Sequence, residues 1–368
     1  MDYLLETHAV PGQVVLDPFC GSGTVLQEAA THNLAAIGLE INPAAYAMAK
    51  FFALSHLTVT GRKRLIEEAR QVINSQVARV AHDLPLFNGS PDYRENASNL
   101  LDFAWGILNA TRNKQTRLLL LLTLFRSEGG ANGTLATTVM KAFASLSEDL
   151  LCLPIADHSI TAVLSDARCA HEGRRPKADI IITSPPYINV FNYHQNYRAV
   201  LELVGFDMLE VAKSEIGSNR KHRANRFFTV VQYCLDIEES LKSFAKAMVP
   251  NGLLIMVLGR ESRVRGIPFG NARIAETLLD RVGAYSPPAR HERVFVNRFG
   301  QPIYEDILVA KRVGEPTHTT VARDIATDFL TKALGHDASL EVSNDIREAL
   351  SFVSDIKSSP LLNKDALI

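Results

Sequence analysis

The sequence lacks a hydrophobic run of the length that a membrane-spanning helix needs. Its purely apolar stretches, such as Leu118 to Leu122, are far shorter than the roughly 20 residues required. The first residues, Met1 to His8, include Asp2 and Glu6 and have neither a basic leader nor a long apolar stretch. We therefore expect no secretory signal and a cytoplasmic protein.

Cysteine is also scarce. The four cysteines, Cys20, Cys152, Cys169 and Cys234, are widely spaced, with no C-x-x-C pair and no histidine nearby at zinc-ligand spacing. This pattern argues against a disulfide framework and against a zinc site, so no metal is expected.

A global excess of positive charge is missing as well, since the 368 residues carry a formal net charge of -1. The charge is unevenly distributed, however. Residues 213–312 hold 17 Lys and Arg against 10 Asp and Glu, a net charge of +7. The average therefore hides a basic stretch of the kind that contacts nucleic acid.

Short apolar runs alternate with helical patterns in a way that predicts an α/β fold. Val14 to Asp17 and Ala35 to Leu39 are expected strands, and Thr24 to Ala30 between them is an expected helix. Five more strands are expected, at Ile160 to Leu164, Asp179 to Thr183, Leu253 to Leu258, Glu292 to Asn297 and Asp306 to Lys311. The last two flank Gly300, which signals a hairpin, and we expect the final strand to be antiparallel in a seven-stranded, mostly parallel sheet.

Two further regions have helical patterns. We divide the chain into a catalytic core of residues 1–60 and 155–312, a helical insertion of residues 61–154 and a helical C-terminal tail of residues 313–368. The insertion, the basic stretch and the tail are all candidates for recognising a target sequence.

A glycine-rich loop, Asp17-Pro-Phe-Cys-Gly21-Ser-Gly23-Thr24, follows the first strand and opens the first helix of this βαβ unit. Parallel sheets bind ligands at such a turn, because glycine lets the backbone approach closely. Leu26 stands where the dinucleotide fingerprint needs its third glycine, and the loop lacks the lysine of a phosphate-binding loop.

Three carboxylates stand at the ends of expected strands. Asp17 would repel a pyrophosphate but accept hydrogen bonds from a cationic amino group. Glu40 is placed to take both hydroxyls of a ribose, and Asp166 to accept from an adenine amino group. Together they predict a site for S-adenosylmethionine.

The strand Asp179 to Thr183 runs directly into Ser184-Pro185-Pro186-Tyr187. The two prolines donate no backbone hydrogen bonds and hold the chain extended, so carbonyls and the Ser184 hydroxyl remain acceptors. Two such acceptors hold an exocyclic amine with its lone pair directed at a methyl donor. Tyr187 is expected to stack on an extruded base.

These residues resemble the amino-group-specific DNA methyltransferases of restriction and modification systems. Asp17 to Thr24 looks like their cofactor motif, Leu39 to Pro43 like their ribose-binding strand end, Leu164 to Ala167 like their adenine-binding turn, and Thr183 to Tyr187 like their catalytic motif. The resemblance covers roughly residues 10–55 and 155–312. It implies the class I fold of S-adenosylmethionine-dependent methyltransferases, and a cofactor site that includes Phe19, Gly21, Ser22, Gly23, Thr24 and Asn42 beside the three carboxylates.

In that family, serine at the first catalytic position usually accompanies N4-cytosine methylation, whereas Asp or Asn usually accompanies N6-adenine methylation. Ser184 therefore favours cytosine N4, with N6-adenine as the alternative. The chain has no Cys-Pro dipeptide, so covalent attack on cytosine C6 is not indicated.

Double-stranded DNA is the expected partner, and a cognate restriction endonuclease or another defence-system component is a further candidate. We expect Arg220, Lys221, Arg223 and Arg226, in the basic stretch downstream of the catalytic motif, to contact phosphates. Three arginines after the strand Leu253 to Leu258 are candidates for the same surface: Arg260, Arg263 and Arg265.

Two other functions stay open at this point. One is an RNA or protein amino-group methyltransferase, although such enzymes usually carry Asp or Asn where Ser184 stands. The other is a subunit that binds cofactor and DNA without methylating it.

Overall fold

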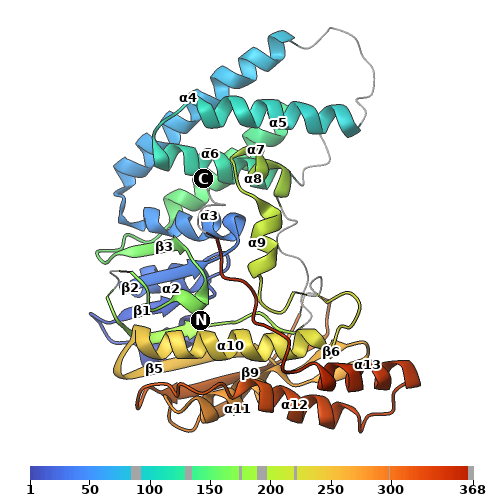
Figure 1. Ribbon diagram of the computed structural model, residues 1–368. Coiled ribbons are helices and arrows are strands. Elements are labelled where there is room, and N and C mark those ends of the chain that lie inside the picture. Colours follow the sequence, from blue (N-terminus) through green and yellow to red (C-terminus); the bar gives the residue numbers. More distant parts are fainter. Residues whose placement is uncertain are drawn as a thin grey trace.

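A seven-stranded sheet runs through the computed structural model (Figure 1), which describes residues 1–83, 93–128, 135–173, 176–188, 197–218, 222–297 and 299–363. The strand order is β3-β2-β1-β4-β5-β9-β8. The strands are β1 (Val14–Asp17), β2 (Ala35–Glu40), β3 (Ile160–Leu164), β4 (Ala178–Thr183), β5 (Met248–Gly259), β8 (Ala289–Val296) and β9 (Pro302–Lys311). A separate hairpin is formed by β6 (Ser262–Val264) and β7 (Ile267–Phe269).

The first five strands of the sheet pair in parallel, and β9 lies antiparallel between β5 and β8. The predicted seven-stranded, mostly parallel sheet with an antiparallel final strand is thereby confirmed. The turn between β8 and β9 contains Gly300 at φ +77°. Because β1 to β4 are parallel, their carboxyl ends meet at one edge of the sheet, where ligands bind in open α/β folds.

Both faces of the sheet are covered, as the continuous apolar runs of its strands predict. On one face, Leu16, Ile181 and Met256 belong to a core shared with α10 (Phe228–Ala247), α11 (Asn271–Val282) and α12 (Ala322–Ala333). On the other face, Val15 and Ile180 pack with residues of α1 (Asp2–His8) and α2 (Thr24–Thr31). The alternation of neighbouring residues between the two cores is that of a strand buried on both sides.

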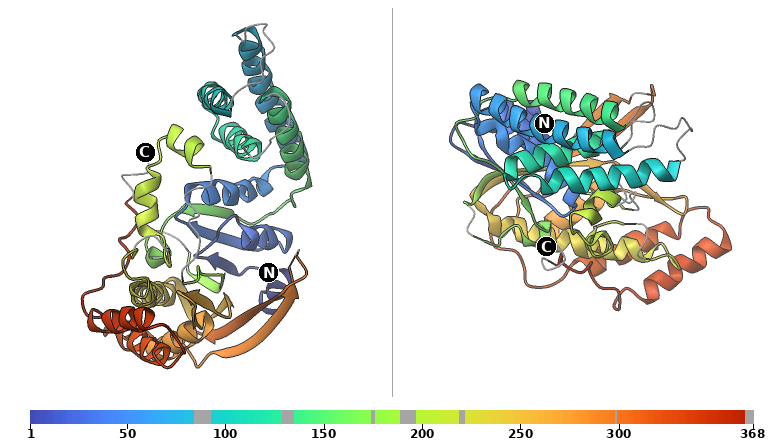
Figure 2. Two further views of the ribbon diagram at one scale, coloured as in Figure 1. Left: turned by 90° about the vertical axis from the view of Figure 1, so that its right-hand side faces the viewer. Right: turned by 90° about the horizontal axis from the view of Figure 1, so that it is seen from above.

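The helices expected in residues 61–154 are present. They are α4 (Val59–Asp83), α5 (Tyr93–Asn109), α6 (Lys114–Ser127) and α7 (Leu135–Cys152). In Figures 1 and 2 they lie beyond the β3 edge of the sheet. They share a second core with α3 (Pro43–Phe51), α8 (Arg198–Leu203) and α9 (Met208–Ser214). Short 3-10 helices, η1 (Phe52–His56) and η2 (Ala167–Cys169), follow α3 and β3.

The tail forms α12 and α13 (Leu340–Ser351) and then an extended segment that climbs past α10 toward the insertion (Figure 1). Val353 and Ile356 are buried in the core beneath the sheet, whereas Leu362 is buried in the second core. The segment from 352 to 363 therefore connects the two cores.

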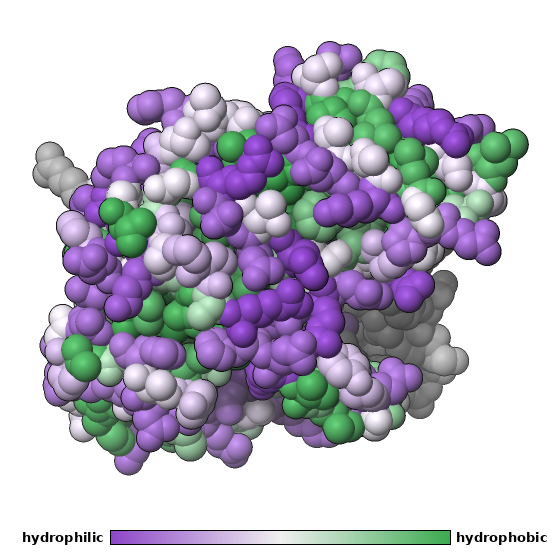
Figure 3. Space-filling view, turned by 90° about the horizontal axis from the view of Figure 1, so that it is seen from below, coloured by the Kyte–Doolittle hydropathy of each residue, from purple (hydrophilic) through white to green (hydrophobic). Residues whose placement is uncertain are grey.

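The described part of the chain contains no helix that is both long enough and apolar enough to span a membrane. On the face seen in Figure 3, hydrophilic side chains predominate and the hydrophobic ones form small separate groups.

Candidate active site

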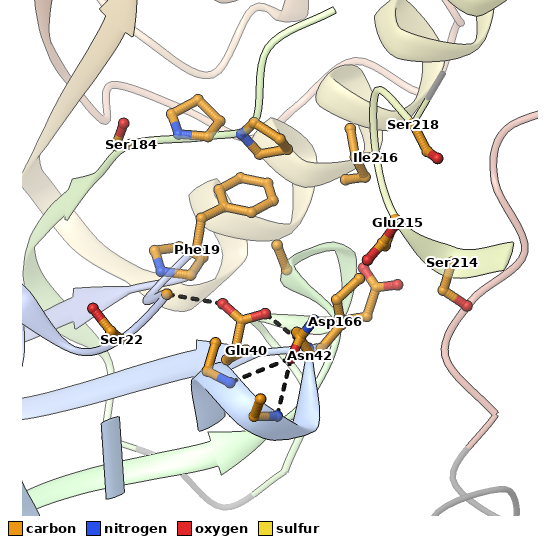
Figure 4. A pocket seen from close by; sticks show the side chains of 18 of the residues that line it. Phe19, Ser22, Glu40, Asn42, Asp166, Ser184, Ser214, Glu215, Ile216 and Ser218 are labelled. Atoms are coloured by element: carbon orange, nitrogen blue, oxygen red, sulfur yellow. Dashed lines mark hydrogen bonds between the residues drawn. The ribbon is translucent and has the colours of Figure 1, made fainter. Parts of the chain in front are cut away.

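A cavity of about 470 Å³ opens at the carboxyl ends of the parallel strands (Figure 4). Ten of the residues predicted to bind cofactor or act in catalysis line it. They are Phe19, Gly21, Ser22, Glu40, Asn42, Asp166, Ser184, Pro185, Pro186 and Tyr187. Residues from β1, β2, β3 and β4 thus meet at one site, although the sequence separates Glu40 from Asp166 by the whole insertion.

Glu40 ties the glycine-rich loop to the end of β2. Its Oε2 accepts a 2.8 Å hydrogen bond from the Gly21 backbone N–H, and its Oε1 accepts a 2.7 Å bond from the N–H of Asn42. Burial raises the pKa of the Glu40 carboxyl, although the backbone hydrogen bonds from Asn42 and Gly21 lower it. Asn42 itself caps α3, since its Oδ1 accepts from the backbone N–H groups of Ala44 and Ala45.

Asp17 is buried beneath the loop and is not among the residues that line the cavity. Its Oδ1 accepts a 2.6 Å hydrogen bond from the Thr183 hydroxyl and a 3.1 Å bond from the Phe19 N–H. Burial raises the pKa of Asp17 to about 7, even though these two hydrogen bonds lower it. Through these hydrogen bonds Asp17 connects β1, the glycine-rich loop and β4.

Gly23 and Thr24, the last two loop residues of the prediction, also lie outside the cavity lining. Gly23 precedes α2 at φ +99°, and a Cβ atom there would lie 2.7 Å from the Phe52 ring and 2.9 Å from the Ala49 Cα. Thr24 is the exposed first residue of α2. Gly23 therefore allows α2 to pack closely on the end of α3.

Asp166 reaches the cavity while held in a buried ion pair that the sequence did not indicate. Its two carboxylate oxygens accept hydrogen bonds from Nε and Nη2 of Arg168, at 3.0 and 2.6 Å. The Arg168 backbone N–H also donates to Oδ1, at 2.9 Å. An adenine amino group would therefore meet a carboxylate whose orientation is already fixed.

The Ser-Pro-Pro-Tyr segment forms the wall beyond β4. Ser184 is exposed (Figure 4), and Pro185 and Pro186 after it also line the cavity. The ring of Tyr187 lies directly against Gly259, the last residue of β5, where a Cβ atom would come within 2.8 Å of the tyrosine Cε2. The position of Tyr187 therefore depends on the absence of a side chain at residue 259.

The facing wall was missed by sequence reasoning. It is formed by the last residue of α9 and the segment that follows, with Ser214, Glu215, Ile216 and Ser218 lining the cavity. Figure 4 shows the Glu215 side chain extending toward Asp166 and Asn42. The negative charge of Glu215 contributes to raising the pKa of Glu40, after burial. Nothing in the sequence around Glu215 distinguishes it from an ordinary charged residue after a helix.

The charges of this lining have one sign. Among the described residues that line the cavity are three carboxylates, Glu40, Asp166 and Glu215, and no lysine or arginine. Such a cavity favours a cationic ligand over a pyrophosphate.

The residues predicted to contact DNA are only partly described. Arg220 and Lys221 lie outside the described residues. Arg223 is exposed, whereas Arg226 is half-buried and its Nη1 is buried with no hydrogen-bond partner among the described residues.

The three arginines expected to extend that surface are ion-paired. Arg260 contacts Glu292 and Asp306, and Arg263 contacts Glu261. Arg265 binds Glu341 and Asp345 of α13. The carboxylate partners reduce the net positive charge that these three arginines add to the surface.

Residues 1–51 match a DNA methylase family model of the N6/N4 type. This stretch contains the glycine-rich loop, Glu40 and the whole of α3, but not the insertion or the Ser-Pro-Pro-Tyr segment. No curated protein matches the chain.

Three solved structures that resemble the chain have low sequence identity to it. TrmN from Thermus thermophilus is 14% identical with a TM-score of 0.35, over 84% of this chain and 47% of TrmN. A SAM-dependent methyltransferase from Methanosarcina mazei is 11% identical with a TM-score of 0.37, over 85% and 98% of the two chains. Magnesium protoporphyrin IX methyltransferase from Synechocystis, with bound SAM, is 12% identical with a TM-score of 0.34, over 84% and 74%. The chain thus spans about half the length of TrmN. Structural similarity at these TM-scores does not indicate the activity of this chain.

Proposed function

We propose that this protein is an S-adenosylmethionine-dependent DNA methyltransferase that methylates the exocyclic N4 amine of cytosine. One observation carries the proposal: the glycine-rich loop and the Ser-Pro-Pro-Tyr segment line the same cavity, and the charged side chains among its described lining residues are carboxylates. A methyl donor with a positive charge fits this lining. A dinucleotide with an anionic pyrophosphate does not.

The lining residues fit the cofactor group by group. Glu40 accepts from the ribose hydroxyls, and Asp166 from the adenine amine, while Phe19, Gly21 and Ser22 provide the loop against which it lies. When bound, S-adenosylmethionine supplies an electrophilic methyl group. Glu215, rather than the buried Asp17, is the third carboxylate that faces this cationic ligand.

The substrate amine is held by the end of β4. The Ser184 hydroxyl and the Pro185 carbonyl accept from the amine, and the Tyr187 ring holds the extruded base. Serine is too weak a base to remove a proton in advance, so the proton leaves the amine during or after transfer and passes to solvent. Neither Ser184 nor Tyr187 forms a bond to the base.

DNA is the substrate class that the family match of residues 1–51 favours. Arg223 and Arg226, with Arg220 and Lys221, would then contact phosphates, and double-stranded DNA would be the partner. The assignment of cytosine as the target base depends on the serine at position 184, and N6 of adenine is the alternative methylation position. A restriction endonuclease that cuts the same sequence is the partner protein that this reaction class would serve.

The proposal is tested first by isothermal titration calorimetry with S-adenosylmethionine and, in parallel, with NAD⁺. We expect S-adenosylmethionine to bind and NAD⁺ not to bind, because the carboxylates that attract a sulfonium repel a pyrophosphate. Preferential binding of NAD⁺ would reject a methyltransferase. Binding of S-adenosylmethionine without methyl transfer to any DNA would instead favour the non-catalytic subunit.

A further inference from the structure

A cluster of buried charges lies directly behind the cavity. Arg168 bridges Asp166, which lines the cavity, and Asp236 of α10, to which its Nη1 donates at 3.1 Å. The side chains of Arg168 and Asp236 are 2% and 0% exposed, and that of Asp166 is 4% exposed. Burial lowers the pKa of Arg168, but Asp166 and Asp236 together raise it above its usual value. The guanidinium is therefore charged and needs its partners in place.

The extended segment after α13 completes this cluster. Ser359 donates from its backbone N–H to Asp236 Oδ1 at 2.7 Å, and from its hydroxyl to Asp236 Oδ2 at 2.6 Å. Arg168 in turn donates to the carbonyl oxygens of Ser359 and Pro360. Ser359 and Pro360 thus contact the guanidinium of Arg168, although they follow it in the chain by 191 and 192 positions.

Apolar anchors hold the same segment on both sides of Ser359. Ile356 is buried in the core beneath the sheet, and Leu362 in the core of the insertion. Gln232 of α10 also donates to the Lys357 carbonyl at 3.1 Å. Removing one hydroxyl from Ser359 therefore leaves the segment attached.

We propose that the segment from Lys357 to Leu362 supports the cofactor site from outside the cavity, with Ser359 as a positioning residue that sets the orientation of Asp166 through Asp236 and Arg168. The inference rests on the proposed function, because Asp166 is the residue assigned to the adenine amine. Two hydrogen bonds from Ser359 fix the Asp236 carboxylate, which fixes Nη1 of Arg168, and the other nitrogens of Arg168 fix both oxygens of Asp166. A substitution at Ser359 should therefore change the affinity for the cofactor, although Ser359 itself does not contact the cofactor.

The test uses the full chain with Ser359→Ala, and Ser358→Ala as the matched control. Ser358 is half-buried in the same segment, and its hydroxyl makes no hydrogen bond to another described residue. By calorimetry, Ser359→Ala should weaken S-adenosylmethionine binding about tenfold, roughly the worth of one hydrogen bond to a charged group. Its KM for S-adenosylmethionine should rise by the same factor while kcat at saturation stays unchanged. Ser358→Ala should bind like the wild type.

A double-mutant cycle with Asp166→Asn separates positioning from a general structural effect. If Ser359 acts through Asp166, adding Ser359→Ala to Asp166→Asn should weaken binding by less than about twofold. A full further tenfold loss in that background would overturn the proposal. So would equal affinities of wild type and Ser359→Ala, with the proposed function left standing. If the wild type binds no S-adenosylmethionine, the proposed function fails first and this inference with it.

Discussion

The hydroxyl of Thr183, the last residue of β4, donates a 2.6 Å hydrogen bond to the carboxylate of Asp17, the last residue of β1. Thr183 immediately precedes Ser184, and Asp17 begins the glycine-rich loop. One buried hydrogen bond thus connects the segment proposed to hold the substrate with the loop proposed to hold the cofactor. The alignment of the two depends on a pair of residues that need not contact either ligand.

The titration of Asp17 gives a pH prediction. The folded carboxyl keeps its proton up to about pH 7, whereas its ordinary pKa is 3.8. Between these values the folded state binds more protons than the unfolded chain, so the free energy of unfolding should fall as pH rises through this window. Asp17→Asn removes the titration and should flatten that fall.

Urea unfolding across the same pH window checks the prediction. Asp337→Asn, which changes an exposed carboxyl, is the control and should leave the wild-type slope unchanged. Identical slopes for the wild type and Asp17→Asn would contradict a raised pKa at residue 17.

Glu40→Ala should weaken S-adenosylmethionine binding by about 2 to 3 kcal/mol, because a charge-assisted contact to both ribose hydroxyls is lost. The variant should also lower the melting temperature, since the N–H groups of Gly21 and Asn42 lose their acceptor. Glu40→Gln retains one acceptor oxygen and should fall between the wild type and Glu40→Ala. If calorimetry gives wild-type affinity for Glu40→Ala, the assignment of Glu40 to the cofactor site is wrong.

Gly259→Ala tests the position of Tyr187. The added methyl would lie 2.8 Å from the tyrosine Cε2, so the ring must move. We expect methyl transfer to slow by about tenfold or more, since small displacements of a bound reactant are costly, while cofactor affinity changes little. Gly314→Ala is the control, because its nearest neighbouring atom would be 3.6 Å away. Wild-type transfer rates in Gly259→Ala would mean that Tyr187 does not hold the base.

Ser184→Ala should reduce the single-turnover rate of methyl transfer roughly 10- to 100-fold, the effect of losing one contact to the amine worth about 1 to 3 kcal/mol. Its affinity for S-adenosylmethionine should stay within about twofold of the wild type, because the exposed hydroxyl of Ser184 makes no hydrogen bond to the described residues of the glycine-rich loop. Rapid-quench measurements with saturating cofactor separate the two effects. An unchanged rate would exclude Ser184 from the chemistry.

Local sequence was sufficient to predict the seven strands of the main sheet, but not the β6–β7 hairpin, and to predict ten of the residues that line the cavity. Each of Phe19, Glu40 and Ser184 stands at the end of a short apolar run, and the ends of parallel strands must meet at one edge. The same reasoning could not assign Asp17 to the buried hydrogen bond with Thr183. Both residues end strands, and only the pairing of β1 with β4 brings their side chains together.

The remaining parts of the site depend on contacts between distant segments. Asp236 lies 68 residues from Arg168 and 123 from Ser359, and no spacing or composition connects the three. Glu215 faces the cavity because α9 packs with the insertion helices in the second core. Such residues are identified by tertiary packing, which a pattern along one chain does not encode.

The central claim is tested most directly by mass spectrometry of nucleosides, from DNA incubated with the purified protein and isotopically labelled S-adenosylmethionine. We expect labelled N4-methylcytosine, with roughly 10- to 100-fold less from the Ser184→Ala variant at matched short times. Labelled N6-methyladenine would contradict the assignment of the base. Label recovered only in RNA or protein, with none in DNA, would contradict the account of this chain as a DNA methyltransferase.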